Sequence, residues 1–174
     1  MKEVRLYNMI LPPFMLFLFI PWLWIVSIVG NFIIDSVVLL LLILIMFRKF
    51  DFKMYKDTIF SVWFYGFIAD ILGVLYLVSV ALGSNAEYYE GSNIWKQILS
   101  GIYLATSHSH FDSIYGVLFI VSGILLSAIL IFLFNYFISF RNSILSNKQK
   151  LIVSLAIAVL TAPYTFLLPK ELFY

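Results

Sequence analysis

Residues 58–82 read TIFSVWFYGFIADILGVLYLVSVAL, an apolar stretch in which Asp70 is the only charged residue. A helix needs about 20 consecutive apolar residues to cross the hydrocarbon core of a bilayer, which is about 30 Å thick. The stretch therefore predicts a transmembrane helix with one acidic side chain near its middle. Because ionisable groups are costly inside a membrane, Asp70 is the first candidate for a functional residue.

The whole chain shares this apolar character. Of its 174 residues, 63% are hydrophobic and only 11% are charged, against about 25% charged residues in an ordinary soluble domain. A soluble core could not bury so much apolar side chain. The net charge of +2 offers no basic face for nucleic acid, and the lack of cysteine excludes disulfides and thiolate metal sites. We therefore expect a single all-α domain, residues 1–174, embedded in lipid.

Apolar stretches along the chain predict five membrane spans. The first apolar run, 9–47, is nearly twice as long as one span, and Gly30-Asn31 is a natural helix stop that divides it. The expected fold is a polytopic helical bundle whose spans cover about 9–29, 32–47, 58–82, 113–138 and 151–168. A four-span alternative, in which part of 9–29 lies in the interface or re-enters the membrane, stays open because that segment holds Pro12, Pro13 and Pro21.

The distribution of basic residues predicts how the chain is threaded, because cytoplasmic loops are enriched in Lys and Arg. With five spans and a cytoplasmic N-terminus, only Lys96 and Lys170 fall outside. The inside set is Lys2, Arg5, Arg48, Lys49, Lys53, Lys56, Arg141, Lys148 and Lys150. We therefore expect an integral protein of the plasma (inner) membrane with its C-terminus outside. The many Ile, Phe, Asn and Lys residues suggest an AT-rich bacterial genome.

The longest segment expected outside the bilayer is 83–112. Its middle, 93–103, has helical period, with Ile94, Ile98 and Ile102 on one face. Such a short amphipathic helix is expected to lie in the outer interface of the membrane. It either covers the bundle or forms a lid over an outward-facing site.

Asp70 lies on a face of small residues. Gly66, Ala69, Asp70 and Gly73 follow the i, i+3, i+4, i+7 spacing of one helix face, and such a face lets helices approach closely. Asp70 is therefore expected to point into the bundle and not at lipid. Two interpretations stay open, namely a functional acid, or an acid whose hydrogen bond to a neighbouring helix locks the packing.

Asp35 is expected to be shallower than Asp70. If a span begins at residue 32, Asp35 lies in its first turn, where the helix dipole favours an acidic side chain, and Asn31 lies one turn above it. We expect both residues to be accessory. The depths of Asp35 and Asp70 should differ by roughly 12 Å, so a site with both as direct ligands is not expected.

Residues 107–112 read SHSHFD and form a candidate metal site. In an extended segment His108, His110 and Asp112 project to one side, and imidazole with carboxylate suits Zn²⁺ or a similar ion. A helical conformation would separate the two histidines. The alternative is that Asp112 or Ser113 caps the next span.

The last two spans hold small and polar residues but no charged group in their interiors. Gly116, Gly123 and Ser127 follow one face of the fourth span, and Asn135 adds an amide near its inner end. The corresponding stripe on the fifth span is Ser154, Ala158, Thr161 and Thr165. Pro163 is expected to bend that span. These faces either pack against other helices or line a polar cavity with Asp70 at its floor.

No catalytic motif is present, since HExxH, GxSxG, P-loop and dinucleotide-binding sequences are all absent. We expect a non-enzyme without a cofactor, apart from the possible metal ion. The first hypothesis is a membrane component that handles a small solute or cation, with Asp70 central. The second is a structural or assembly subunit that docks partner helices, and the third an outward-facing metal-dependent membrane enzyme. Because so short a chain encloses only a narrow cavity, we expect a homo-oligomer or a larger membrane complex.

Overall fold

The computed structural model describes residues 21–48, 51–84, 86, 88–89, 93–107 and 109–168, with side chains from residue 25 onward. No strand occurs in this part of the chain. The long helices are α2 (Pro21–Phe47), α3 (Phe52–Gly83), α5 (Ile114–Phe134) and α6 (Asn147–Leu160). The shorter elements are helix α4 (Ile94–Ser107), the 3-10 turns η1 (His110–Asp112) and η3 (Tyr164–Leu167), and the π-turn η2 (Asn135–Ser139).

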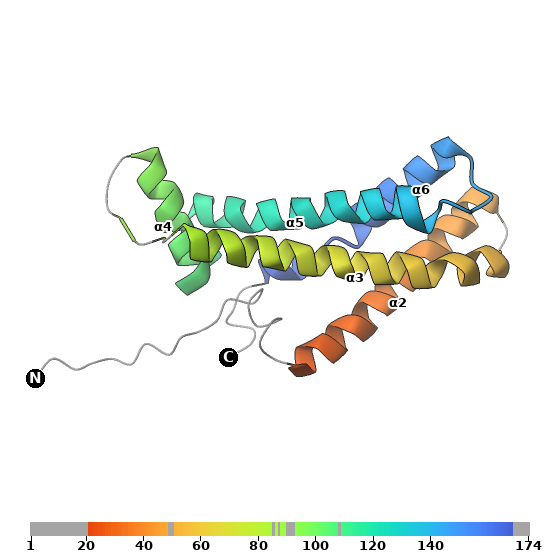
Figure 1. Ribbon diagram of the computed structural model, residues 1–174, viewed down its shortest axis with the longest axis horizontal. Coiled ribbons are helices and arrows are strands. Elements are labelled where there is room, and N and C mark those ends of the chain that lie inside the picture. Colours follow the sequence, from red (N-terminus) through yellow and green to blue (C-terminus); the bar gives the residue numbers. More distant parts are fainter. Residues whose placement is uncertain are drawn as a thin grey trace, which may run out of the picture.

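The long helices form an antiparallel bundle. α3 and α5 lie side by side along the long axis of the molecule, and α2 crosses α3 obliquely (Figure 1). α6 packs against α5 and α2, and α4 packs across the start of α5. The α2–α3 and α5–α6 connections lie at one end of the bundle, which we call the connection end, and α4 lies at the other, which we call the α4 end (Figure 1).

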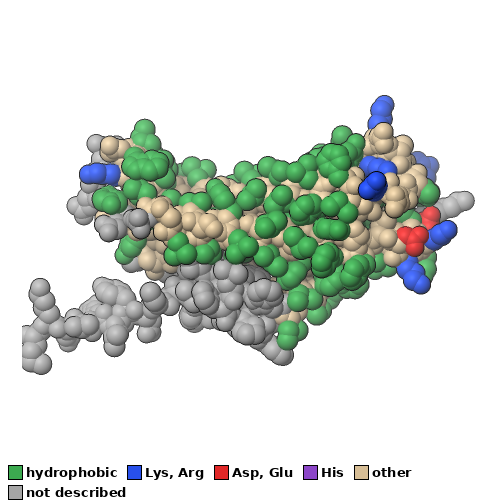
Figure 2. All heavy atoms as spheres, viewed as in Figure 1, with side chains coloured by type: hydrophobic (Ala, Val, Ile, Leu, Met, Phe, Trp, Pro, Cys, Tyr) green, Lys and Arg blue, Asp and Glu red, His purple; other side chains and the backbone are tan. Residues whose placement is uncertain are grey.

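The outer surface of the bundle is apolar. Large side chains such as Ile45, Phe60 and Leu125 are more than half exposed, and hydrophobic side chains cover the visible face along its length (Figure 2). A soluble monomer rarely shows so large an apolar surface. The stretches long and apolar enough to cross a membrane are Ile25–Phe47, Phe52–Gly83, Ile114–Ser139 and Asn147–Leu167. The structure confirms an all-helical chain whose four long segments have the character of membrane spans.

The predicted break at Gly30-Asn31 is wrong, because α2 runs through both residues without interruption. A glycine inside a helix costs about 1 kcal/mol relative to alanine. Breaking the helix would instead leave several backbone groups without partners in an apolar environment, where each costs more. The boundary between the expected spans 9–29 and 32–47 therefore does not exist, and residues 9–20 lie outside the described part of the chain.

The end of α6 also differs from the expected single helix over 151–168. A capping box at Ser146 and Gln149 starts α6, which ends at Leu160. Pro163 has no N–H to donate to the Val159 carbonyl, and the Tyr164 hydroxyl donates to that carbonyl instead. Pro163 therefore breaks the helix, and the chain continues as η3.

Helix starts follow side-chain caps at other points in the bundle. The Asp51 carboxylate accepts the Met54 N–H at 3.0 Å, so α3 begins before its predicted apolar part. Ser113 accepts the Tyr115 N–H at 3.2 Å, as one of the two predictions for this position required. Asn93 accepts the Trp95 N–H at 2.9 Å at the start of α4.

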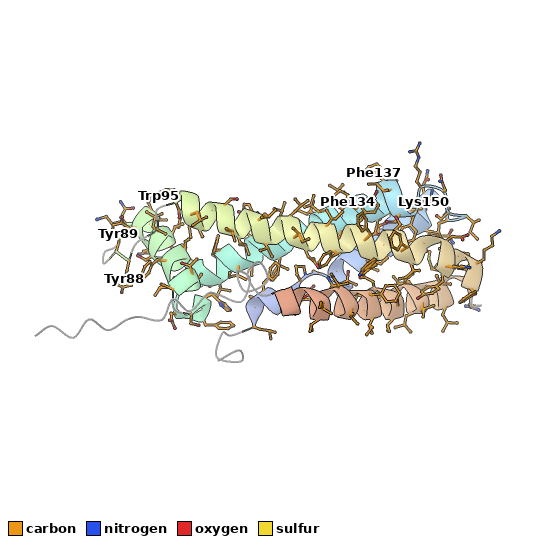
Figure 3. All side chains as sticks on the ribbon, turned by 60° about the horizontal axis from the view of Figure 1, so that its bottom comes forward. Tyr88, Tyr89, Trp95, Phe134, Phe137 and Lys150 are labelled. Atoms are coloured by element: carbon orange, nitrogen blue, oxygen red, sulfur yellow. The ribbon has the colours of Figure 1, made fainter. Side chains whose placement is uncertain are left out.

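α4 lies where an interfacial helix is expected. Ile94 and Trp95 at its start are about two-thirds exposed, and Tyr88 in the preceding connection is also exposed. The aromatic side chains of Tyr88, Tyr89 and Trp95 lie together at the α4 end (Figure 3). Aromatic side chains concentrate at membrane–water interfaces. Gly101 lets α4 approach α5 closely, since a Cβ there would lie 2.8 Å from the Gly116 backbone nitrogen.

The small residues of α3 and α5 lie where these two helices meet. The Ser127 hydroxyl donates to the Ala69 carbonyl at 3.2 Å. A Cβ on Gly73 would lie 2.0 Å from Ser127 Oγ and 3.1 Å from the Gly123 carbonyl oxygen. A Cβ on Gly123 would in turn lie within 2.8 Å of the Leu77 side chain. The close approach of α3 and α5 therefore depends on these missing side chains.

We predict that Gly73→Ala destabilises the protein by about 1–3 kcal/mol, because Ser127 must turn away and lose its hydrogen bond or the helices must separate. Gly30→Ala is the matched control. No described atom lies within 4 Å of its Cβ position, so this variant should gain about 0.5–1 kcal/mol. The free energy of unfolding in detergent measures both. Equal destabilisation of the two variants would contradict the close packing at Gly73.

Candidate functional site

Asp70 is bound by an amide from the neighbouring helix. The Asn31 side chain on α2 donates from Nδ2 to Asp70 Oδ2 at 2.9 Å. The other carboxyl oxygen of Asp70 is buried and has no hydrogen-bond partner within the described residues. The carboxyl group therefore faces α2, inside the bundle, and only one of its two oxygens has a partner among the described residues.

Asp35 lies about one helical turn, or about 6 Å, from the level of Asp70, because Asp70 bonds Asn31 and Asp35 is four residues further along α2. This offset is smaller than the roughly 12 Å expected from the sequence. Asp35 is only 4% exposed, and a Cβ on Gly66 would lie 3.4 Å from Asp35 Oδ2. Gly66 is one helical turn from Asp70, so both acids lie in the same part of the contact between α2 and α3. We call Asp35 and Asp70 the acid pair.

The depth estimate failed because it depended on the break in α2. In the continuous helix, Asp35 lies about 18 Å from the Phe47 end, and Gly66 lies about 21 Å from the adjacent Phe52 end of α3. Asp35 is therefore near the middle of α2. Its carboxyl group is not in a first turn, so the helix dipole does not explain its place.

The break in α6 lies beside the acid pair. Thr161, which caps the end of α6, lies about 21 Å from the start of that helix at Asn147, and its side chain lies near the Asp35 carboxyl. The Thr161 hydroxyl donates to the Ile157 carbonyl at 3.0 Å. Its oxygen can therefore still accept a proton or bind a cation.

Sequence reasoning placed Thr161 on a face that either packs against other helices or lines a polar cavity with Asp70 at its floor, but it did not place Thr161 beside Asp35. The signal that would have found it is the proximity of Thr161 to Pro163 in the middle of an apolar run. Proline frees backbone groups that other partners must satisfy.

The site holds carboxyl, amide and hydroxyl groups, and no basic side chain among the described residues. Every Lys and Arg that the structure describes lies at a helix end or in a connection, so none of them neutralises the acid pair. Carboxylate, amide and hydroxyl oxygens are the ligands that hard cations prefer, and carboxylates also hold protons. The arrangement therefore suits a proton or a small cation.

The remaining polar residues predicted for function lie elsewhere. Asn135 is completely buried at the start of η2, on a different helix from either acid. His110 and Asp112 form a 3-10 turn rather than the extended segment that the metal hypothesis required. His110 is buried, with Nε2 3.3 Å from the Leu167 carbonyl oxygen, whereas Asp112 is exposed. His108 lies outside the described residues.

Comparison with known proteins adds no assignment. No protein-family model, no curated protein and no solved structure matches the chain.

We predict that Asn31 and Asp70 are energetically coupled. In a double-mutant cycle with Asn31→Ala and Asp70→Ala, the free energies of unfolding should deviate from additivity by about 1 kcal/mol, the size found for interhelical hydrogen bonds. Asn31→Ala combined with Ser143→Ala, in the α5–α6 connection, should be additive because the sites are distant. Additivity of the first pair would contradict the hydrogen bond.

Proposed function

We propose that α2, α3, α5 and α6 cross a membrane, with the connection end in the cytoplasm. The described basic residues support this orientation, since all but Lys96 lie at the connection end (Figure 2). They are Arg48, Lys53, Lys56, Arg141, Lys148 and Lys150, and cytoplasmic loops are enriched in such residues. The described residues hold four of these crossings, and the chain leaves η3 on the outer side. A bacterial plasma membrane stays the proposed location, and the predicted cytoplasmic N-terminus lies outside the described residues.

Cysteine labelling tests this threading, because the chain has no cysteine of its own. We expect Asn93→Cys, next to α4, to react with a membrane-impermeant thiol reagent added outside intact cells. Ser143→Cys, in the α5–α6 connection, should react only after the cells are opened. Reaction of both positions in intact cells would contradict four crossings with this orientation.

We propose that the protein binds a small cation or a proton at the acid pair and moves it across the membrane without catalysing a chemical reaction. The observation that carries this proposal is a pair of buried carboxyl groups, near the middle of the helices, with no described basic partner. Ionisable residues in membrane spans typically mark ion or proton pathways. The break in α6 supports the same function, since interrupted helices supply ion ligands at mid-membrane in transporters.

Each residue of the site has a defined part in this proposal. The carboxyl oxygens of Asp70 and Asp35 replace the water shell of the cation, and the buried, unpaired Oδ1 of Asp70 is the first available ligand. Asn31 orients Asp70 by donating to its other oxygen. The Thr161 hydroxyl turns its oxygen to a cation when its proton points at the Ile157 carbonyl.

The assembly hypothesis receives less support from the described residues. That hypothesis uses the small-residue stripes as docking faces for partner helices. Contacts between α3 and α5 of the same chain already occupy Gly73, Gly123 and Ser127. Association into a homo-oligomer or a larger complex stays a prediction.

Asp70→Asn tests the function directly. Purified protein in vesicles should move Na⁺ or H⁺ down an imposed gradient, followed with dyes for each ion, and Asp70→Asn should reduce the flux to the leak of empty vesicles. The asparagine has nearly the same shape, so helix content should be unchanged. Asp112→Asn, which removes an exposed acid in η1, is the matched control and should transport normally. Wild-type flux in folded Asp70→Asn would refute the proposal.

A further inference from the structure

The connection end is hollowed by a cleft of about 350 Å³. Asp51 and Asp57 line it from the start of α3 together with one basic residue, Lys53, and Asn142 lines it from the α5–α6 connection. Thr58 and Ser139, both at most 9% exposed, form its polar inner wall. The cleft therefore offers acidic and hydroxyl groups to a cation at the end of the bundle that carries the basic loops.

Polar groups continue inward from this cleft. The Ser61 hydroxyl on α3 donates to the Ser139 hydroxyl at 3.1 Å. Asn135 lies one turn deeper, at the junction of α5 and η2, and is 0% exposed. The π-turn η2 packs against both α3 and α6. Ser154 on α6 is also 0% exposed.

Both of these inner residues have unused hydrogen-bonding groups. The amide nitrogen and oxygen of Asn135, and the hydroxyl oxygen of Ser154, are buried without a partner among the described residues. Buried polar groups are almost always satisfied, and ordered water satisfies those that protein atoms do not reach. The unpaired groups therefore indicate water at this depth.

Ser154 lies on the same face of α6 as Thr161, which is near the acid pair. Thr161 lies two turns further along α6, about 10 Å away, and its side chain lies near Asp35. Ala158, between them on the same face, is small and buried. Buried hydroxyl groups of α6 thus lie at two levels between the cleft and the middle of the bundle, within the apolar cluster that also holds Val153 and Ile157.

We propose that Asn135 and Ser154 line a water-filled passage through which a cation or proton reaches the acid pair from the cleft at the connection end. This inference rests on the proposed function for its destination. The hydration of the passage is a separate property that can be measured without any transport.

Single cysteines in this cysteine-free chain test the passage. In vesicles with 2-aminoethyl methanethiosulfonate on both sides, Ser154→Cys should react at least about tenfold faster than Leu155→Cys, because only a hydrated thiol ionises to the reactive thiolate. Leu155 is the matched control, since it is the next residue of α6 and is 52% exposed on the outer apolar surface. Equal rates would overturn the passage.

Further variants keep the test decisive. If Ser154→Cys does not fold, Ala158→Cys takes its place with the same control. Adding Asn135→Leu should slow the reaction at position 154 about tenfold by closing the passage to water. An unchanged rate would show that Asn135 does not line the passage. Rapid labelling together with normal transport by Asp70→Asn would retain the passage and refute the acid-pair function. Slow labelling together with loss of transport in Asp70→Asn would refute the passage and retain the acid-pair function.

Discussion

Two carboxyl groups buried between apolar helices, with no basic side chain from the described residues to balance them, set the main constraint on this structure. Burying an ionised carboxylate costs several kcal/mol even after the protein relaxes. The hydrogen bond from Asn31 to Asp70 recovers only part of that cost, since a hydrogen bond to a charged group contributes about 1.5–3 kcal/mol. A proton or a bound cation is the remaining way to neutralise the pair, and this need connects the fold to the proposed function.

The geometry of α3 allows the acid pair to exist. Gly66 and Gly73 are two turns apart on one face of α3, yet they admit different partners. Gly66 leaves room for Asp35 of α2, whereas Gly73 leaves room for Ser127 of α5. α2 crosses α3 obliquely (Figure 1), and its contacts with α3 extend from the Tyr55–Ser36 hydrogen bond to the Asp70–Asn31 hydrogen bond. The missing side chains therefore position two helices around one acidic turn.

The sequence predicts those features that depend on composition and periodicity. The all-helical class, the apolar helices over 58–82 and 113–138, and the Ser113 cap all follow from local patterns. The stripe through Gly66 and Gly73 also places Asp70 toward the bundle. These signals are strong because backbone N–H and C=O groups in an apolar environment must pair within the chain, and a helix pairs them all.

The features that sequence reasoning missed depend on contacts between helices. Gly30-Asn31 looks like a helix stop, but the cost of an unpaired backbone in an apolar environment exceeds the local preference. That one error moved Asp35 to the wrong depth and hid the acid pair. The part of Thr161 was missed for a related reason, since the nearby Asp35 lies on a helix more than 100 residues away in the chain. The function and the partners stay predictions.

The π-turn at Asn135–Ser139 has a geometric consequence for α5. Ser127 and Ser139 both bond to α3, through Ala69 and Ser61, although residues twelve apart on a regular helix point about 120° away from each other. A π-turn takes up one extra residue, and this reduces the offset to about 20°. The widened turn thus resets the rotation of α5, so that a single side of this helix stays in register with α3 from the centre of the bundle to its end.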